Sequence, residues 1–162
     1  IGGGHVPSWT EELEAALEKE ERIVRALLEQ ALLKTPALQV GNIAALGAIV
    51  NTEQPLVLQL RGVQEGQRCL LAQNGVAGKT LREVIGQAPD RAKTLSHRRE
   101  TLQAAALELQ RVNEKNHTIA AARFAQYDHL VKTMQKPQAL YTSQGAAAAR
   151  ESASRAFIDQ KI

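Results

Sequence analysis

One run of residues constrains the fold more than any other feature: from Asp90 to Gln135 the sequence contains neither glycine nor proline. Pro89 precedes this run and Pro137 follows it closely. Because proline is tolerated in the first turn of a helix but cannot continue one, the two prolines predict a single helix between them. At 1.5 Å per residue, that helix is roughly 69 Å long. A compact domain of this size cannot enclose such a helix, so the run predicts a rod.

Apolar side chains recur along the run at close to the 3.5-residue spacing of a coiled coil. Two residues that we call the polar notch, Asn113 and Asn116, interrupt this seam in its middle. A buried amide must find hydrogen-bond partners, so the notch predicts either a register-setting contact or local exposure where the stripe drifts. Such a rod needs partner helices, and we expect the rest of the chain to supply them. The predicted seam contains Leu95, Leu102, Ala106, Leu109, Ala120, Tyr127, Leu130 and Met134.

The composition favours helices throughout the chain. Hydrophobic residues make up 44%, enough for a helical core, whereas aromatic residues are only 3%, which disfavours a large β-rich core or an aromatic ligand pocket. Alanine, leucine, glutamine, glutamate and arginine dominate, and all are good helix formers. We predict an all-α fold: an elongated antiparallel helical bundle or coiled coil of three long helices, with one short helix and a C-terminal tail that can form a helix.

Prolines and glycines set the predicted boundaries. Pro36 disfavours helical geometry at Thr35, so the first helix should end near Lys34. Pro55 removes a backbone donor and predicts a kink in the second helix, which Asn74-Gly75 should end. We expect a flexible N-terminus or non-native remnant at 1–8 and a coiled-coil bundle at 9–135, followed by a tail at 136–162. Within the bundle, helices are expected at about 9–34, 42–73, 80–86 and 90–135.

The formal net charge of +3 is unevenly distributed. Residues 1–34 hold seven acidic and four basic side chains, whereas residues 90–135 hold five acidic and eight basic ones. This complementarity favours packing of the first helix on the long helix. A nucleic-acid surface would need a denser basic cluster, preferably with stacking aromatics, so no nucleic-acid partner is expected.

No residue pattern predicts catalysis. None of the four histidines lies three or four residues from another, and neither cysteine–histidine nor HExxH metal spacing occurs. Gly78-Lys79-Thr80 lacks the earlier glycine and the preceding strand of a phosphate-binding loop. We therefore expect no enzyme, no cofactor and no metal site.

The cysteine content and the short apolar runs indicate the cellular compartment of the protein. The single cysteine, Cys69, cannot form an intramolecular disulfide and fits a reducing compartment. The longest apolar run, Ile43 to Val50, is far shorter than a membrane span, and residues 1–8 lack the regions of a signal peptide. We expect a cytoplasmic protein without membrane insertion.

The notch and the tail together carry a family resemblance. Asn113-x-x-Asn116-His117, the helix that continues to Leu130, and then Leu140-Tyr141-Thr-Ser-Gln-Gly145 resemble the FlgN family of bacterial flagellar type III export chaperones. Two departures from the family pattern are Pro55, where members run an unbroken helix, and Thr142, where glycine is more usual.

The resemblance implies a cytoplasmic chaperone that binds the C-terminal helices of hook-filament junction (hook-associated) proteins. Such a chaperone prevents premature assembly and delivers its clients to the flagellar export apparatus. Tyr141 resembles the tyrosine of the family that is implicated in docking to the export gate. The tail is either a frayed terminus or a segment that orders on a partner, and its candidate client-binding residues are Ala153, Ala156, Phe157 and Ile158.

A second function class stays open at this point. A coiled-coil rod can serve as a structural adaptor or scaffold unrelated to export, assembling through its long seam. The same 3.5-residue stripe serves intramolecular bundles and self-associating copies alike.

Overall fold

The computed structural model describes residues 8–134, and this part of the chain is helical without strands. Its elements are α1 (Trp9–Val40), α2 (Ile43–Gln73), α3 (Leu81–Gly86), a 3₁₀ turn η1 (Pro89–Arg91) and α4 (Ala92–Met134). The predicted all-α bundle of three long helices and one short helix is confirmed. No helix within the described range is both long enough and apolar enough to cross a bilayer.

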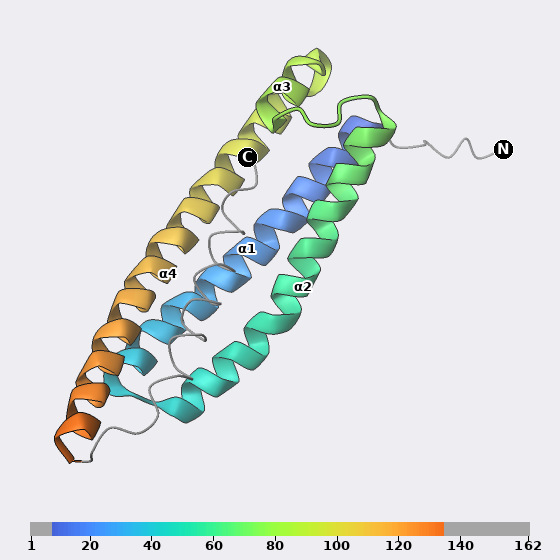
Figure 1. Cartoon of the computed structure of the whole chain (residues 1–162). Helices are drawn as coiled ribbons and strands as arrows, with labels where there is room; N and C mark the ends of the chain where they lie inside the picture. The colour runs from blue at the N-terminus through green and yellow to red at the C-terminus, as the bar shows by residue number, and fades with distance from the viewer. Residues whose placement is uncertain (1–7, 135–162) are drawn as a thin grey trace.

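In the view of Figure 1 the three long helices run down, up and down, with α1 between α2 and α4. An ion pair between Lys34 and Glu53 joins the end of α1 to the first half of α2, so these helices are antiparallel. Arg91 pairs with Glu11 near the starts of α4 and α1, so those two helices are parallel. The short elements α3 and η1 turn the chain at one end of the bundle.

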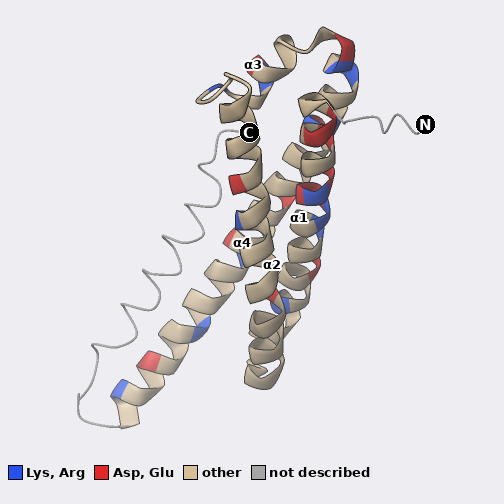
Figure 2. Ribbon diagram, turned by 90° about the vertical axis from the view of Figure 1, so that its right-hand side faces the viewer, with Lys and Arg blue, Asp and Glu red and all other residues tan. Residues whose placement is uncertain are grey.

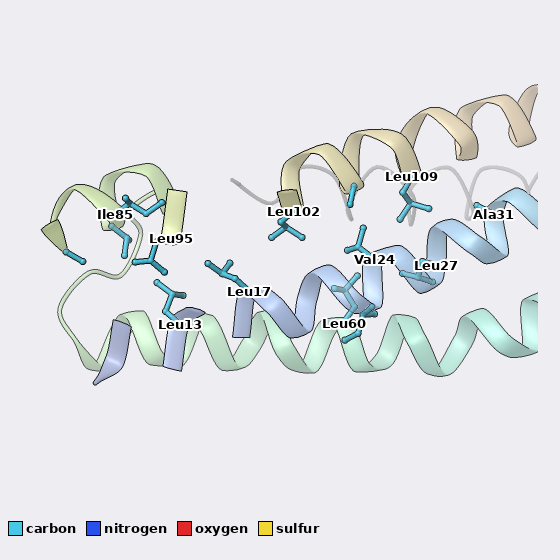
Figure 3. Packing of buried hydrophobic residues seen from close by; sticks show 14 of the residues in the cluster. Leu13, Leu17, Val24, Leu27, Ala31, Leu60, Ile85, Leu95, Leu102 and Leu109 are labelled. Carbon is cyan, nitrogen blue, oxygen red and sulfur yellow. The ribbon is translucent and has the colours of Figure 1, made fainter. Parts of the chain in front are cut away.

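α1 supplies apolar side chains toward both neighbours, and most of the core lies along it (Figure 3). Leu13 and Leu17 are each 1% exposed, as is Leu60 on α2. From α4, side chains at seven-residue spacing reach the same core, as the predicted seam requires. Those three are Leu95, Leu102 and Leu109.

A buried carboxylate also joins α1 to α2. Glu20 is 5% exposed and accepts hydrogen bonds from Gln64 Nε2 at 3.1 Å and Gln67 Nε2 at 2.5 Å. A buried polar group without partners would cost free energy, so the two amides allow Glu20 to lie within the apolar interface.

Helix ends follow local sequence signals. Ser8 caps α1 in a capping box with Glu11, and the Asn42 side chain caps α2 by accepting from the Ala45 amide. Between the two helices Gly41 has φ 68°, in the left-handed region that glycine adopts without steric cost.

The predicted end of the first helix near Lys34 is wrong, because α1 continues through Pro36 to Val40. Proline removes one intrahelical hydrogen bond but leaves the next turn free to form. That turn is held by packing, since Ala37 is buried with 7% exposure. Tertiary burial therefore outweighs the local preference of the Thr35-Pro36 step.

Pro55 does not end α2, which is one continuous helix from Ile43 to Gln73; the predicted kink at this position stays a prediction. Pro55 and Asn51 both lie on the exposed side of α2, so water can bond the Asn51 carbonyl that loses its amide partner. Thr52 donates its hydroxyl to the Ala48 carbonyl at 3.1 Å instead of capping a new helix.

Burial in the core predicts how much stability is lost when a leucine side chain is shortened to alanine. Leu102→Ala removes a side chain that is 2% exposed, and should lower the free energy of unfolding by about 2–5 kcal/mol. Urea denaturation followed by far-ultraviolet circular dichroism measures the change. The matched control is Leu107→Ala on the same helix, where the side chain is 57% exposed. Equal losses in the two variants would contradict this account of the core.

Candidate binding surface

The residues singled out in the sequence divide into two groups. The predicted client-binding residues Ala153, Ala156, Phe157 and Ile158, and the docking candidate Tyr141, lie outside the described residues. Asn113 and Asn116 lie on α4. The structure therefore shows the notch and the helix surface that follows it.

Asn116 lies in the interface between α4 and α1 with 4% exposure. Its Nδ2 donates to the Ala31 carbonyl at 2.7 Å, and its Oδ1 accepts from the Thr35 hydroxyl at 2.6 Å. Ala31 is fully buried, and its small side chain lets the amide reach the backbone of α1. Both functional atoms of the Asn116 amide are therefore bonded to α1.

This contact depends on the axial position of α4 against α1. A shift by one helical turn would separate Asn116 from Ala31 and Thr35, and would leave the buried amide unpaired. Asn113 is only half-buried and does not share the contact. The two notch residues therefore differ, and Asn116 has the geometry that a register-setting residue needs.

Ion pairs spaced seven residues apart join η1 and α4 to α1. Arg91 reaches Glu11 and Glu14 at 2.7 Å each. One heptad later, Arg98 lies 3.6 Å from Glu18 and 3.9 Å from Glu21. The expected packing of the acidic helix on the basic helix is confirmed by these pairs, and charged residues are spaced along both helices in Figure 2.

Glu21 lies where several of these contacts meet. Burial alone would raise the pKa of its carboxyl group. Hydrogen bonds from Arg25 and Thr101, with the positive charges of Arg25 and Arg98, outweigh that effect and hold the pKa below its ordinary value. The carboxylate form of Glu21 is thus the form that the folded chain favours.

Beyond Asn116, α4 presents large apolar side chains to solvent. We call this surface the distal α4 face. Exposure is 66% for Tyr127, 57% for Leu130 and 80% for Met134. Phe124 and Val131 complete the face, with 48% and 38% exposure.

The distal α4 face continues the face by which α4 packs on α1. Five turns of a 3.6-residue helix take 18 residues. That step leads from buried Leu109 to Tyr127, from buried Val112 to Leu130, and from Asn116 to Met134. The exposed residues therefore occupy the same side of the helix as the buried seam.

The lengths of the helices explain the exposure. Thr35 of α1 lies level with Asn116 of α4, and α1 ends soon after, at Val40. Continued at the same rise, α1 stops roughly 13 residues before the end of α4, or about 20 Å. Figures 1 and 2 show the last part of α4 extending away from α1 and α2.

The expected partner helix is present for the first part of the seam, because α1 covers Leu95, Leu102 and Leu109; among residues 8–134 no helix covers its last part. Tyr127, Leu130 and Met134 were assigned to the seam and are exposed, and Phe124 and Val131 were not singled out. The signal was present in the sequence: a long helix paired with shorter ones must extend beyond them.

The described residues offer no centre for metal chemistry, because no three histidine, cysteine, aspartate or glutamate side chains among them are grouped to hold an ion. What this part of the chain presents instead is an apolar helix face without a partner. Such faces mark interaction sites more often than scattered apolar residues do.

Comparison with protein families confirms the resemblance seen in the sequence. A family model described as FlgN protein matches residues 9–149, from the first residue of α1 into the segment beyond α4. Comparison with curated proteins and with solved structures gave no significant match. The match includes the notch, the distal α4 face and Tyr141.

The Asn116 contact predicts a specific loss of stability. Asn116→Ala removes two hydrogen bonds between α4 and α1, those to the Ala31 carbonyl and the Thr35 hydroxyl, and should lower the free energy of unfolding by about 1–3 kcal/mol. Urea denaturation measures it, with Asn113→Ala as the matched control at a half-buried position. A larger loss in the control than in Asn116→Ala would refute the assignment.

The lowered pKa of Glu21 predicts a pH dependence with a definite sign. Its carboxylate contributes stability fully above the unfolded-state value, near the ordinary 4.5, and loses it as the pH falls through the lower folded value. Glu21→Gln should therefore be less stable than the native chain at pH 7, with the gap closing below pH 4.5.

Thermal unfolding from pH 7 to pH 3 tests this dependence. Glu29→Gln, on the exposed side of α1, serves as the control and should differ little from the native chain at pH 7. A gap for Glu21→Gln that widens in acid would have the wrong sign.

Proposed function

The chain belongs to the FlgN family of flagellar export chaperones, and from this premise we propose that it binds the C-terminal helices of hook-filament junction proteins. The observation that carries the proposal is the family match over residues 9–149, which covers the helical bundle and reaches past Tyr141. In this role the protein acts in the cytoplasm, prevents premature assembly of its clients and delivers them to the export apparatus.

The physical basis is the pairing of apolar helix faces. Before assembly, the terminal coiled-coil segments of the clients lack partners and expose apolar stripes. In the tail, Ala156 and Phe157 lie three and four residues after Ala153, so the three share one side of a helix that can cover such a stripe. Ile158 follows directly and adds an apolar side chain beside that side. A segment that orders as it binds loses conformational entropy, so its affinity is modest and release at the membrane is straightforward.

Delivery needs a second contact that leaves the client bound. Tyr141 is the candidate for docking to the export gate, since it precedes the client-binding residues by about a dozen positions. This spacing separates the two proposed contacts along the tail, so both can be made at once.

Calorimetric titration with the C-terminal segment of a hook-filament junction protein tests the proposal. The full chain should bind, and a chain truncated after Gln135 should not. Phe157→Ala combined with Ile158→Ala should weaken the affinity by about tenfold or more, because two apolar anchors are lost. Helicity measured by circular dichroism should be unchanged, since the buried core lies within residues 8–134.

Tyr141→Ala is the matched control, since it removes an aromatic side chain from the same tail but should leave client affinity unchanged. Binding that survives truncation would place the client elsewhere on the chain. Absence of binding to every form would reject the client and favour a scaffold whose partner remains to be found by affinity capture.

A further inference from the structure

The distal α4 face is the one long apolar surface of α4 that the other described helices do not cover. Its residues repeat at heptad spacing, with Phe124 seven residues before Val131 and Tyr127 seven before Met134. They continue the side of α4 that already packs on α1, so the face has the geometry of a helix-binding surface. A helix that continued in the place of α1 beyond Val40 would cover it.

The chain itself holds a segment that can reach this face. Residues 135–162 follow Met134 directly, so the tail starts at the end of the surface to be covered. Pro137 and Gly145 lie within the first part of the tail and favour a reversal of the chain there. As a helix, residues 146–162 would be about 25 Å long, which exceeds the roughly 15 Å between Phe124 and Met134.

The side chains of the two segments are complementary in size. Ala149, Ala153 and Ala156 are spaced four and three residues apart, so they share one face of a helix. Small residues on one helix and large residues on its partner interdigitate without voids. The distal α4 face supplies large side chains such as Phe124 and Tyr127 to lie against these alanines.

The covalent connection between the tail and α4 favours the tail, rather than a second copy of the chain, as the segment that covers the distal α4 face. A short linker holds the tail near α4 at an effective concentration on the order of millimolar. A second copy has to reach the same face at its actual concentration, which in solution is far lower. No other segment outside the described residues lies as close in sequence to the distal α4 face as the tail does.

We propose that, in the absence of client, residues 146–162 dock as a helix on the distal α4 face of the same molecule. Docking buries Phe124, Tyr127, Leu130, Val131 and Met134 together with the alanine face of the tail. An isolated helix of this length is marginal in water, and the apolar contact with α4 provides the missing stabilisation.

One consequence of the docking rests on the proposed function. Ala153 and Ala156 belong both to the docking face and to the proposed client-binding residues. A client and α4 therefore compete for the same side of the tail, and client binding releases the distal α4 face. The docking itself requires no client and can be tested without one.

Amide hydrogen exchange of the full-length chain, read by mass spectrometry, tests the docking. Amides in 146–162 should exchange at least about tenfold more slowly than in an unstructured peptide of the same sequence. In the variant Tyr127→Ser with Val131→Ser, this protection should be lost, while amides of α1 keep theirs. The matched control is Leu58→Ser with Leu107→Ser, which removes two exposed leucines from outside the face and should leave the tail protected.

Protection that is lost only in the distal-face variant and is independent of protein concentration supports the proposal. Exchange of 146–162 at the rate of the unstructured peptide overturns it, as does protection that survives the distal-face substitutions. Protection that rises with protein concentration, together with a dimer in sedimentation velocity, assigns the face to a second copy and also overturns it.

Adding the C-terminal segment of a hook-filament junction protein then separates the two proposals. If the tail is protected by α4 but the client neither binds nor alters the exchange of Tyr127 and its neighbours, docking stands and the proposed function fails. If the client binds to a tail that is unprotected beforehand, the proposed function stands and docking fails.

Discussion

Burial of the apolar side chains of α1 is the interaction on which the structure depends. α1 is the one long helix that packs against both others, whereas α2 and α4 touch each other little. Leu13, Leu17 and Val24 are almost fully buried, and each such side chain contributes about 1.5–3 kcal/mol. Because the core lies along a single helix, the length of α1 decides how much of α2 and α4 is covered.

Polar contacts specify how α4 lies against α1, while the apolar contacts supply most of the stabilisation. Leucine faces alone permit several axial positions of nearly equal energy. The Asn116 amide bonds to Ala31 and Thr35 in one of these positions. In the same position Arg91 of η1 and Arg98 of α4 meet glutamates of α1. A buried amide that is fully paired in one register and unpaired in others selects that register.

The mismatch in helix length gives the molecule a surface for function. A bundle of equal helices would bury the whole seam of α4, and this continuous apolar face would not be open to a partner. Here α1 ends at Val40 and α4 continues to Met134, so Tyr127 and its neighbours are left to solvent at the point where the tail begins. The incomplete bundle thus leaves an apolar helix face that a further helix can cover.

The sequence by itself determined the helical class, the long fourth helix and the pairing of an acidic with a basic helix. These features depend on local propensity and charge, which neighbouring residues decide. The sequence also placed Asn116 in the seam but could not name its partners on α1, 81 and 85 residues away.

Only the tertiary structure decided that α1 passes through Pro36 and that the last turns of α4 are uncovered. A proline inside a helix costs about 3 kcal/mol, which the burial of Ala37 and the core before it can offset. Whether a seam residue is buried depends on where another helix stops, so Leu109 and Tyr127 share a pattern but differ in environment. Their difference is set by the end of α1 at Val40, a feature of packing rather than of the seam itself.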